Sequence, residues 1–524
     1  MGGSNMEATQ LTQPYWFRVS RGDLDAMVSH FGVNITDMAI PALLLAGIGV
    51  PLGFSIGHML PGFSIGFLVA GMWVTWTAHR LAKRTGRTNV TSQVFGINVP
   101  SSTAYAISIM LPVYLHTHSL MDCWAAGAAA VVWMGIFKLI CFPFARFIRR
   151  LIPRTAIMTV FAAAMYTFLS MAIVVRLFSS PLLGVIALAV VLAGVFAKIP
   201  LTKWNLSPFL VAWILVLVVG FSTSNISMAW TGVRVISPWN FVPQLGQYMM
   251  KDVAYFSVIV PMSMYAVLQD IAAVEAAHAV GDEYSVRQTL FMDGICSVLI
   301  GLAGGIIPTV MYAVQPSYKN LGARISYHFW VPILMFVVVV FGLSMPAIDL
   351  FPWSLRAAVI AYVSIGVGRA AITNIEAKHF NAFLLGIIIP AAYLIQSTMH
   401  ESLAALKIHF TPSVMHVLDK AIFWSSIQGM GNGFLMLVLV ITSITVYLID
   451  KKFLTAALWS LFAAVCAWLG LMNAPLFGWA EAPGYAVAWI AGAVVLLLIW
   501  AASPTAVAIT EESMLVGEQA SGGQ

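Results

Sequence analysis

Long apolar runs separated by short polar stretches follow one another along almost the whole chain. Sixteen such segments can be drawn between residues 36 and 503, and many approach the ~20 residues that a helix needs to cross a bilayer. Runs such as PALLLAGIGVPLGF (41–54) and FWVPILMFVVVVFGL (329–343) contain no charged residue. The pattern therefore predicts an all-α polytopic membrane protein.

Two interrupted segments stand in corresponding places of the two halves of the chain. GINVPSST (96–103) and GGIIPTVM (304–311) align Pro100 with Pro308, and each lies in the third segment of its half. Both are too short and too rich in glycine and proline for ordinary spanning helices. Paired breaks of this kind indicate a transporter binding site near the middle of the bilayer. We therefore expect two inverted seven-segment repeats, although short Gly-Pro matches also arise by chance.

The distribution of basic residues orients the segments. With the N-terminus in the cytoplasm, 20 of the 26 lysines and arginines fall on the inner side and 6 on the outer side, as the positive-inside rule requires. The predicted parts are a cytoplasmic amphipathic N-terminus (1–35), a first seven-segment repeat (36–221), an extracytoplasmic loop (222–251), a second repeat (252–448), two additional transmembrane helices (449–503) and a cytoplasmic tail (504–524).

Composition supports the membrane interpretation and excludes other classes. The 524 residues are 60% hydrophobic and 9% charged, with a mean hydropathy of +0.91, whereas soluble domains carry about 25% charged residues. The pI of about 9.1 follows from positive inner loops and does not indicate nucleic-acid binding. Four single cysteines predict neither a metal site nor a disulfide framework. No nucleophile–base pattern is visible, so we expect no enzyme, no cofactor and no metal.

One apparent helix carries four polar side chains. The stretch YAVLQDIAAVEAAHAVGD (265–282) contains Gln269, Asp270, Glu275 and His278. An ionisable side chain inside a membrane is costly and marks a functional site. We expect Asp270 to carry a coupling proton or to hold the broken backbone, and Glu275 to pair with His278 one turn later.

Two other carboxylates lie inside apolar segments. Asp37 falls in the first predicted span and Asp293 in the ninth. Both are candidates for proton coupling, and for both a structural role is the competing interpretation.

Four stretches carry a family likeness. They are RGDLDAMVSHFGVNITD (21–37), RLAKRTGRTNVTSQVFGINVPSS (80–102), VEAAHAVGDEYSVRQTLFMDG (274–294) and GGIIPTVMYAVQPSYKNLGARISY (304–327). In this order they resemble bacterial members of the nucleobase–ascorbate transporter family, the xanthine/uracil permeases with their adenine/guanine/hypoxanthine branch. The resemblance implies fourteen segments in a 7+7 inverted repeat with core and gate domains, plus two extra C-terminal helices, and commonly a homodimer.

The resemblance also implies a site for a nucleobase. The family's eighth segment usually presents a glutamate to the base, and this position holds Gln269. Its tenth segment presents Glu or Gln nine residues before an arginine, which selects Gln315 before Arg324. A carboxamide matches the donor and acceptor of a lactam edge. The predicted substrate-binding residues are Gln269, Gln315, Tyr265 one turn before Gln269, Ser101, Ser102 and Pro316 at the start of a half-helix.

The resulting expectation is a secondary-active permease for a purine or pyrimidine base. It would act by alternating access in the inner or plasma membrane, with lipid around it and protons as the coupling ion. The amide at position 269 departs from the family's glutamate and puts proton coupling in doubt. Two alternatives stay open, a sulfate-type anion carrier of the same architecture and a passive channel for small polar solutes.

Overall fold

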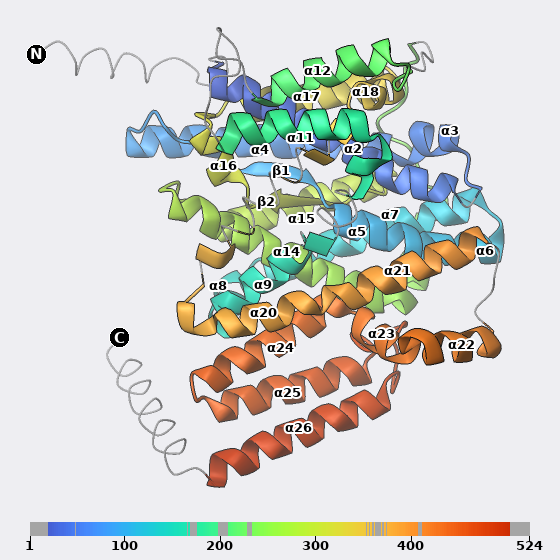
Figure 1. Ribbon diagram of the computed structural model, residues 1–524, viewed down its shortest axis with the longest axis vertical. Helices are drawn as coiled ribbons and strands as arrows, with labels where there is room; N and C mark the ends of the chain where they lie inside the picture. The colour runs from blue at the N-terminus through green and yellow to red at the C-terminus, as the bar shows by residue number, and fades with distance from the viewer. Residues whose placement is uncertain are drawn as a thin grey trace, which may run out of the picture. The chain divides into compact units, whose positions relative to one another are not determined.

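The chain forms two compact units in the computed structural model, whose ribbon is drawn in Figure 1. The first comprises residues 1–145, 165–252 and 262–370, and the second comprises 146–164, 253–261 and 371–524. The structure describes residues 19–47, 49–164, 166–167, 175–196, 208–227, 233–352, 375–406 and 411–502, with scattered residues between 354 and 373. The predicted tail at 504–524 and the first part of the predicted N-terminal segment lie outside the described residues.

The chain is a multi-pass membrane protein. Among the described residues, 6 helices are long and apolar enough to cross a membrane, or 7 if one bent pair counts as a single span. Apolar helices of 10–17 residues cover further predicted segments. The six are Gly22–Ala46, Leu52–Thr85, Leu120–Cys141, Leu245–Ala279, Ala377–His400 and Pro483–Ala502, and the bent pair is Trp424–Gly431 with Phe434–Ile449.

The first described helix, α2 (Arg21–Ala46), begins well before the predicted start of the first span at residue 36. Ser20 forms a capping box with Asp23, because the Ser20 hydroxyl accepts from the Asp23 amide at 3.1 Å and the Asp23 carboxylate accepts from the Ser20 amide at 2.9 Å. Asp23 also accepts from the amide of Arg324 at 2.9 Å. The polar stretch at its start is therefore ordered helix tied to the second half of the chain.

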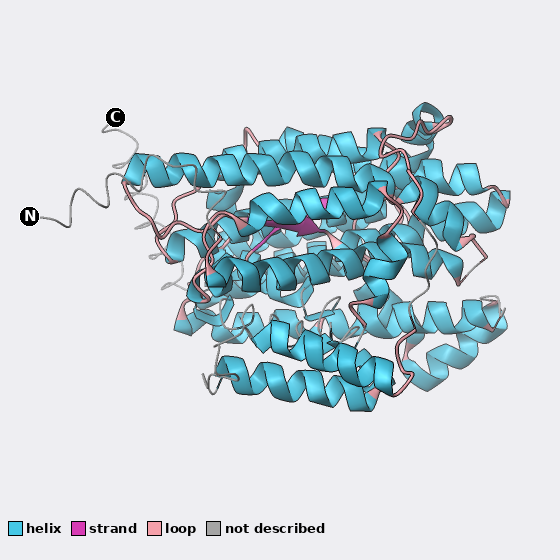
Figure 2. Cartoon of the chain, turned by 90° about the horizontal axis from the view of Figure 1, so that it is seen from above, coloured by secondary structure: helices cyan, strands magenta, loops and turns pink. Residues whose placement is uncertain are grey.

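A short antiparallel strand pair lies among the helices of the first unit (Figure 1; Figure 2). Strand β1 (Val94–Ile97) pairs with β2 (Thr309–Tyr312), with Val94 opposite Tyr312. Non-helical backbone is tolerated at membrane depth only inside protein or along a cavity, and the strand residues are buried except for the partly exposed Tyr312. Each strand follows one helix and precedes another: α4 (Pro61–Thr85) and α5 (Val99–Tyr105) flank β1, and α15 (Val286–Leu302) and α16 (Gln315–Asn320) flank β2.

Packing around the strand pair follows an inverted two-fold pattern. Helix α4 packs against α17 (Tyr327–Val340), and its counterpart α15 packs against α7 (Leu120–Cys141). The second segment of each half therefore contacts the fourth segment of the other half. Glycines permit these contacts, because a Cβ at Gly301 would lie 2.5 Å from Val132 and one at Gly71 would collide with Pro332. The chain has the 7+7 inverted-repeat transporter fold, with α25 (Phe453–Trp468) and α26 (Pro483–Ala502) in addition.

The structure corrects the repeat alignment made from the sequence. Pro100 is the second residue of α5, and the second residue of α16 is Pro316. Pro308 instead lies just before β2. The structural counterparts are therefore Pro100 with Pro316 and Ser101 with Ser317, because each proline is the second residue of the helix that follows its strand.

In the second unit, the glycine-rich stretch GMGNG (429–433) breaks a span. Helices α23 (Trp424–Gly431) and α24 (Phe434–Ile449) meet at 79°. Gly433 has a φ of 66°, which favours glycine, and a Cβ at Gly429 would collide with the Tyr485 hydroxyl. The stretch therefore serves both a break in the span and close packing against Tyr485.

The two additional helices hold that break in place. Asn473 lies between α25 (Phe453–Trp468) and α26 (Pro483–Ala502). Its Nδ2 donates to the Gly429 carbonyl at 2.7 Å, and its Oδ1 accepts from Trp489 Nε1 at 3.3 Å. Its amide donates to the Asn432 carbonyl at 2.9 Å. The connection between the last two helices therefore supplies hydrogen bonds to backbone groups at the kink.

Replacing Asn473 by glycine should lower the stability of this kink. Glycine accepts the φ of 64° at this position but leaves the Gly429 carbonyl without its donor, which costs about 2 kcal/mol when the carbonyl is buried. Hydrogen exchange of residues 424–433 should accelerate accordingly. Asn225→Gly is the control, because Asn225 is exposed and bonds only Thr223 at 2.8 Å among the described contacts. Equal exchange in both variants would contradict the assignment.

Candidate functional site

Two helices start at opposite ends of the strand pair (Figure 1). Asn98 caps α5, since its Oδ1 accepts from the Ser101 amide at 3.1 Å. No side chain caps α16, whose second residue is Pro316. Helix N-termini carry a partial positive charge, whereas the amides of Ser101, Ser102, Ser317 and Tyr318 at these two ends are bonded within the chain. The strand pair is thus bounded by two ends that favour electronegative ligand atoms.

Three ionisable side chains meet beside β2, each fully buried. Asp270 on α14 (Phe256–Ala279) accepts from the Met311 amide of β2 at 2.9 Å. Asp293 on α15 accepts from the Thr309 hydroxyl at 2.7 Å and from Lys138 Nζ at 2.5 Å. The two carboxyl groups of Asp270 and Asp293 are neighbours that repel one another when both are ionised. We call Asp270, Asp293 and Lys138 the buried trio.

When all three groups are ionised, the buried trio has one more negative charge than positive charges. Lys138 contributes one positive charge, whereas Asp270 and Asp293 contribute two negative charges when ionised. Oδ2 of Asp270 receives no hydrogen bond from the described part of the chain. A buried, uncompensated charge is strongly unfavourable. The trio is therefore suited to bind one monovalent cation, a proton included, at Asp270.

Three predicted ligands present unpaired polar atoms in the same unit. Gln269, Tyr265 and Ser101 are 2%, 1% and 0% exposed. Gln269 Oε1, the Tyr265 hydroxyl and Ser101 Oγ form no hydrogen bond with any described residue. Buried polar groups are normally paired, so these atoms are available to a ligand. Ser102 differs, because its hydroxyl donates to the Asn98 carbonyl at 2.6 Å.

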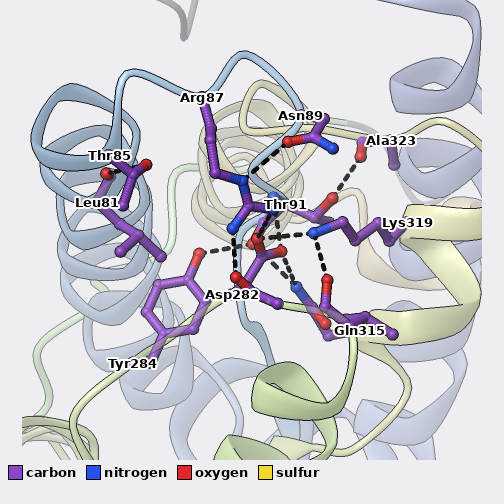
Figure 3. Close-up of polar contacts among 12 residues, drawn as sticks. Leu81, Thr85, Arg87, Asn89, Thr91, Asp282, Tyr284, Gln315, Lys319 and Ala323 are labelled. Carbon is purple, nitrogen blue, oxygen red and sulfur yellow. Dashed lines mark hydrogen bonds and ion pairs between the residues drawn. The ribbon is translucent and has the colours of Figure 1, made fainter.

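Gln315 belongs to a second polar cluster (Figure 3). Its Nε2 donates to Asp282 Oδ2 at 2.7 Å and to the Thr91 carbonyl at 3.2 Å. A carboxamide has two N–H donors, and both are used here. Only Oε1, which has no partner among the described residues, remains for a ligand. The predicted use of Gln315 as donor and acceptor together does not fit this geometry.

Asp282 is the centre of that cluster (Figure 3). Its carboxylate lies 3.1 Å from Arg87 and 2.7 Å from Lys319, and it accepts from the Thr91 amide at 3.2 Å. The Asp282 side chain is fully buried, whereas those of Arg87 and Lys319 are 33% and 14% exposed. Together with Gln315, this group joins the chain after α4, the connection from α14 to α15, and the start of α16.

The other predicted carboxylates lie elsewhere in the first unit. Asp37 is 1% exposed in α2, and Glu275 is partly buried in α14. His278, the expected partner of Glu275, places Nε2 2.8 Å from the Tyr284 carbonyl oxygen. Of the four predicted carboxylates, the described contacts unite Asp270 with Asp293.

Sequence reasoning missed Lys138 and Asp282. Lys138 is an isolated charge in the apolar run CWAAGAAAVVWMGIFKLIC (123–141), which is the signal that selected Asp270. Asp282 gave no such signal, because it stands in the polar stretch GDEYS (281–285). A carboxylate there is solvated in most proteins, and only the fold reveals that it is buried.

Comparisons with known proteins give structural neighbours alone. No protein-family model and no curated protein matches the chain. It is similar to the transmembrane domain of a cyanobacterium bicarbonate transporter, BicA, at 14% identity, covering 74% of this chain and 98% of that chain, with a TM-score of 0.45. It is also similar to SLC26A9 at 11% identity, covering 80% of this chain and 65% of that chain, with a TM-score of 0.45.

The assignment to the nucleobase–ascorbate transporter family is therefore wrong. No family model supports it, and the neighbouring structures are a bicarbonate transporter and SLC26A9, outside that family. The physical reason lies in what the motifs encode. Their Gly, Pro and Ser residues form breaks, caps and close helix contacts, which belong to the fold and do not specify a ligand.

Proposed function

We propose that this chain is a secondary-active membrane transporter of a small oxyanion, coupled to a monovalent cation at the buried trio. The supporting observation is the strand pair itself, bounded by the N-terminal ends of α5 and α16 and contacted by Asp270 at Met311. A cation site and an anion-favouring site then share β2. In this proposal the chain lies in the cell membrane with its N-terminus in the cytoplasm.

The unpaired atoms favour an anion that also carries a hydroxyl. The two helix ends attract negative oxygens. Gln269 Oε1 and Gln315 Oε1 are acceptors without partners among the described residues, so each gains from a donor on the ligand. Bicarbonate offers charged oxygens and one O–H, and it is the first anion to test. Nitrate has no hydrogen-bond donor and is therefore the control anion.

The coupling between anion binding and cation binding follows from charge balance. An anion entering between the helix ends adds negative charge near a trio that already lacks one positive charge. Binding of a proton or another cation at Asp270 removes that excess and favours the loaded state. Each ligand therefore raises the affinity for the other, and by linkage the effect is reciprocal. Alternating access then moves both together.

The test is uptake by purified protein in proteoliposomes. We expect labelled bicarbonate to enter faster when the vesicles are preloaded with unlabelled bicarbonate, and an inward proton gradient to increase its accumulation. Nitrate should compete weakly. A channel shows no acceleration by preloading. Uptake of uracil or xanthine with no effect of any oxyanion would overturn the proposed substrate class.

Replacing Ser101 by alanine should weaken anion binding. The Ser101 hydroxyl has no partner among the described residues, so its removal leaves the fold intact and deletes one contact to the ligand. Loss of a hydrogen bond to a charged group is worth about 1.5 kcal/mol, which raises KM about tenfold. Ser102→Ala is the matched control, because that hydroxyl is bonded to Asn98. A tenfold KM change in Ser102→Ala with none in Ser101→Ala would reverse the assignment.

A further inference from the structure

We infer that the ammonium group of Lys138 occupies a built-in cation site, so that transport needs no sodium and removal of the amine opens a sodium site. The coupling part rests on the proposed function. The cation site itself rests on the contacts of Lys138 alone.

The surroundings of Lys138 Nζ resemble the ligand shell of a cation. The group is fully buried and lies 2.5 Å from Asp293 Oδ2, 2.6 Å from the Thr309 carbonyl oxygen and 3.5 Å from Ser297 Oγ. An ammonium has three donors, and three oxygens face it. Carboxylate, carbonyl and hydroxyl oxygens are also the ligands that hard metal cations take.

The ligands are fixed independently of the lysine. The Thr309 hydroxyl donates to Asp293 Oδ1 at 2.7 Å and lies 3.2 Å from Ser297 Oγ. Asp293 and Ser297 are one turn apart on α15, and Thr309 begins β2. The oxygens therefore keep their arrangement when the amine is removed. One carboxylate charge then matches one sodium ion.

A tethered cation narrows the choice of coupling ion. Lys138 cannot leave its site during transport, so the site is permanently filled. The uncompensated negative charge is that of Asp270, whose Oδ2 receives no hydrogen bond from a described residue. Sodium needs several oxygen ligands there, and the oxygens of Asp293 are already engaged by Lys138 and Thr309. A proton needs only Oδ2.

The experiment measures thermal melting of purified protein without substrate, in sodium chloride and in choline chloride at equal ionic strength. The wild type should melt at the same temperature in both salts. Lys138→Ala should melt lower in choline and recover by about 3 °C in saturating sodium. The double variant Lys138→Ala/Asp293→Asn lacks the carboxylate and should show no sodium effect.

Three results would overturn the inference. These are a sodium-specific shift in the wild type, an equal response of folded Lys138→Ala to both salts, or a sodium effect that survives in the double variant. If Lys138→Ala cannot be purified, binding of radioactive sodium to membranes containing it replaces melting, and binding no greater than in wild-type membranes refutes the site. Because both salts supply the same chloride concentration and no bicarbonate is added, these outcomes are independent of the proposed substrate.

Discussion

The substitution Asp270→Asn should abolish the response of uptake to a proton gradient while leaving anion exchange active. The carboxamide oxygen of the variant can still accept from the Met311 amide, which bonds Asp270 at 2.9 Å in the wild type, so β2 keeps its support. A carboxamide neither gains nor loses a proton during transport, so the variant cannot carry the coupling proton at this position. Asp293 and Lys138 then form a neutral pair at all times, and anion binding no longer depends on a cation.

The measurement compares two modes of transport by the same vesicles. Gradient-driven accumulation of bicarbonate should fall at least about tenfold, equivalent to ~1.4 kcal/mol of lost coupling, whereas counterflow should change less than about threefold. Glu275→Gln is the control, since Glu275 lies on the same helix, partly buried and away from β2 in sequence. Accumulation by Asp270→Asn at the wild-type level would remove Asp270 from coupling.

The sequence identified the breaks and the charged core through simple physical signals. Proline beside short polar residues in a glycine-rich break marks a helix start, which selected Pro100 and Pro316, and both are second residues of their helices. Carboxylates inside apolar runs selected Asp270 and Asp293, which the structure brings together. Such signals are strong because hydrocarbon tolerates neither free backbone groups nor unpaired charges.

The repeat register and the ligand could not be read in the same way. Pro308 and Pro316 stand in one loop-rich stretch, and only the pairing of Val94 with Tyr312 decides which of them matches Pro100. The substrate was inferred from motifs whose residues build the fold. Partners distant in sequence, such as Gln315 and Asp282, escaped because nothing local indicates which loops meet.

Among the buried carboxylates, Asp282 should be the one whose substitution lowers the stability of the protein most. Asp282→Asn removes the charge that faces Arg87 at 3.1 Å and Lys319 at 2.7 Å. Breaking a buried ion pair costs about 3–5 kcal/mol as a rule, and solvent around Arg87 reduces this to about 3 kcal/mol. The melting temperature should fall by several degrees. Arg87→Gln should cost less, because Arg87 is 33% exposed and Lys319 still pairs with Asp282.

Glu283→Gln is the matched control for Asp282→Asn, because the neighbouring side chain is exposed and such substitutions change stability by about 0.5 kcal/mol or less. The Asp282→Asn substitution should also weaken binding of the anion, because Asp282 positions Gln315. Gln315 Nε2 bonds the Asp282 carboxylate at 2.7 Å, and a neutral carboxamide at this position weakens that charge-assisted bond. Gln315 then turns more freely at the start of α16, so KM for the anion should rise together with the fall in melting temperature. A folded Asp282→Asn protein with unchanged melting and unchanged KM would show that the cluster neither stabilises the first unit nor positions Gln315.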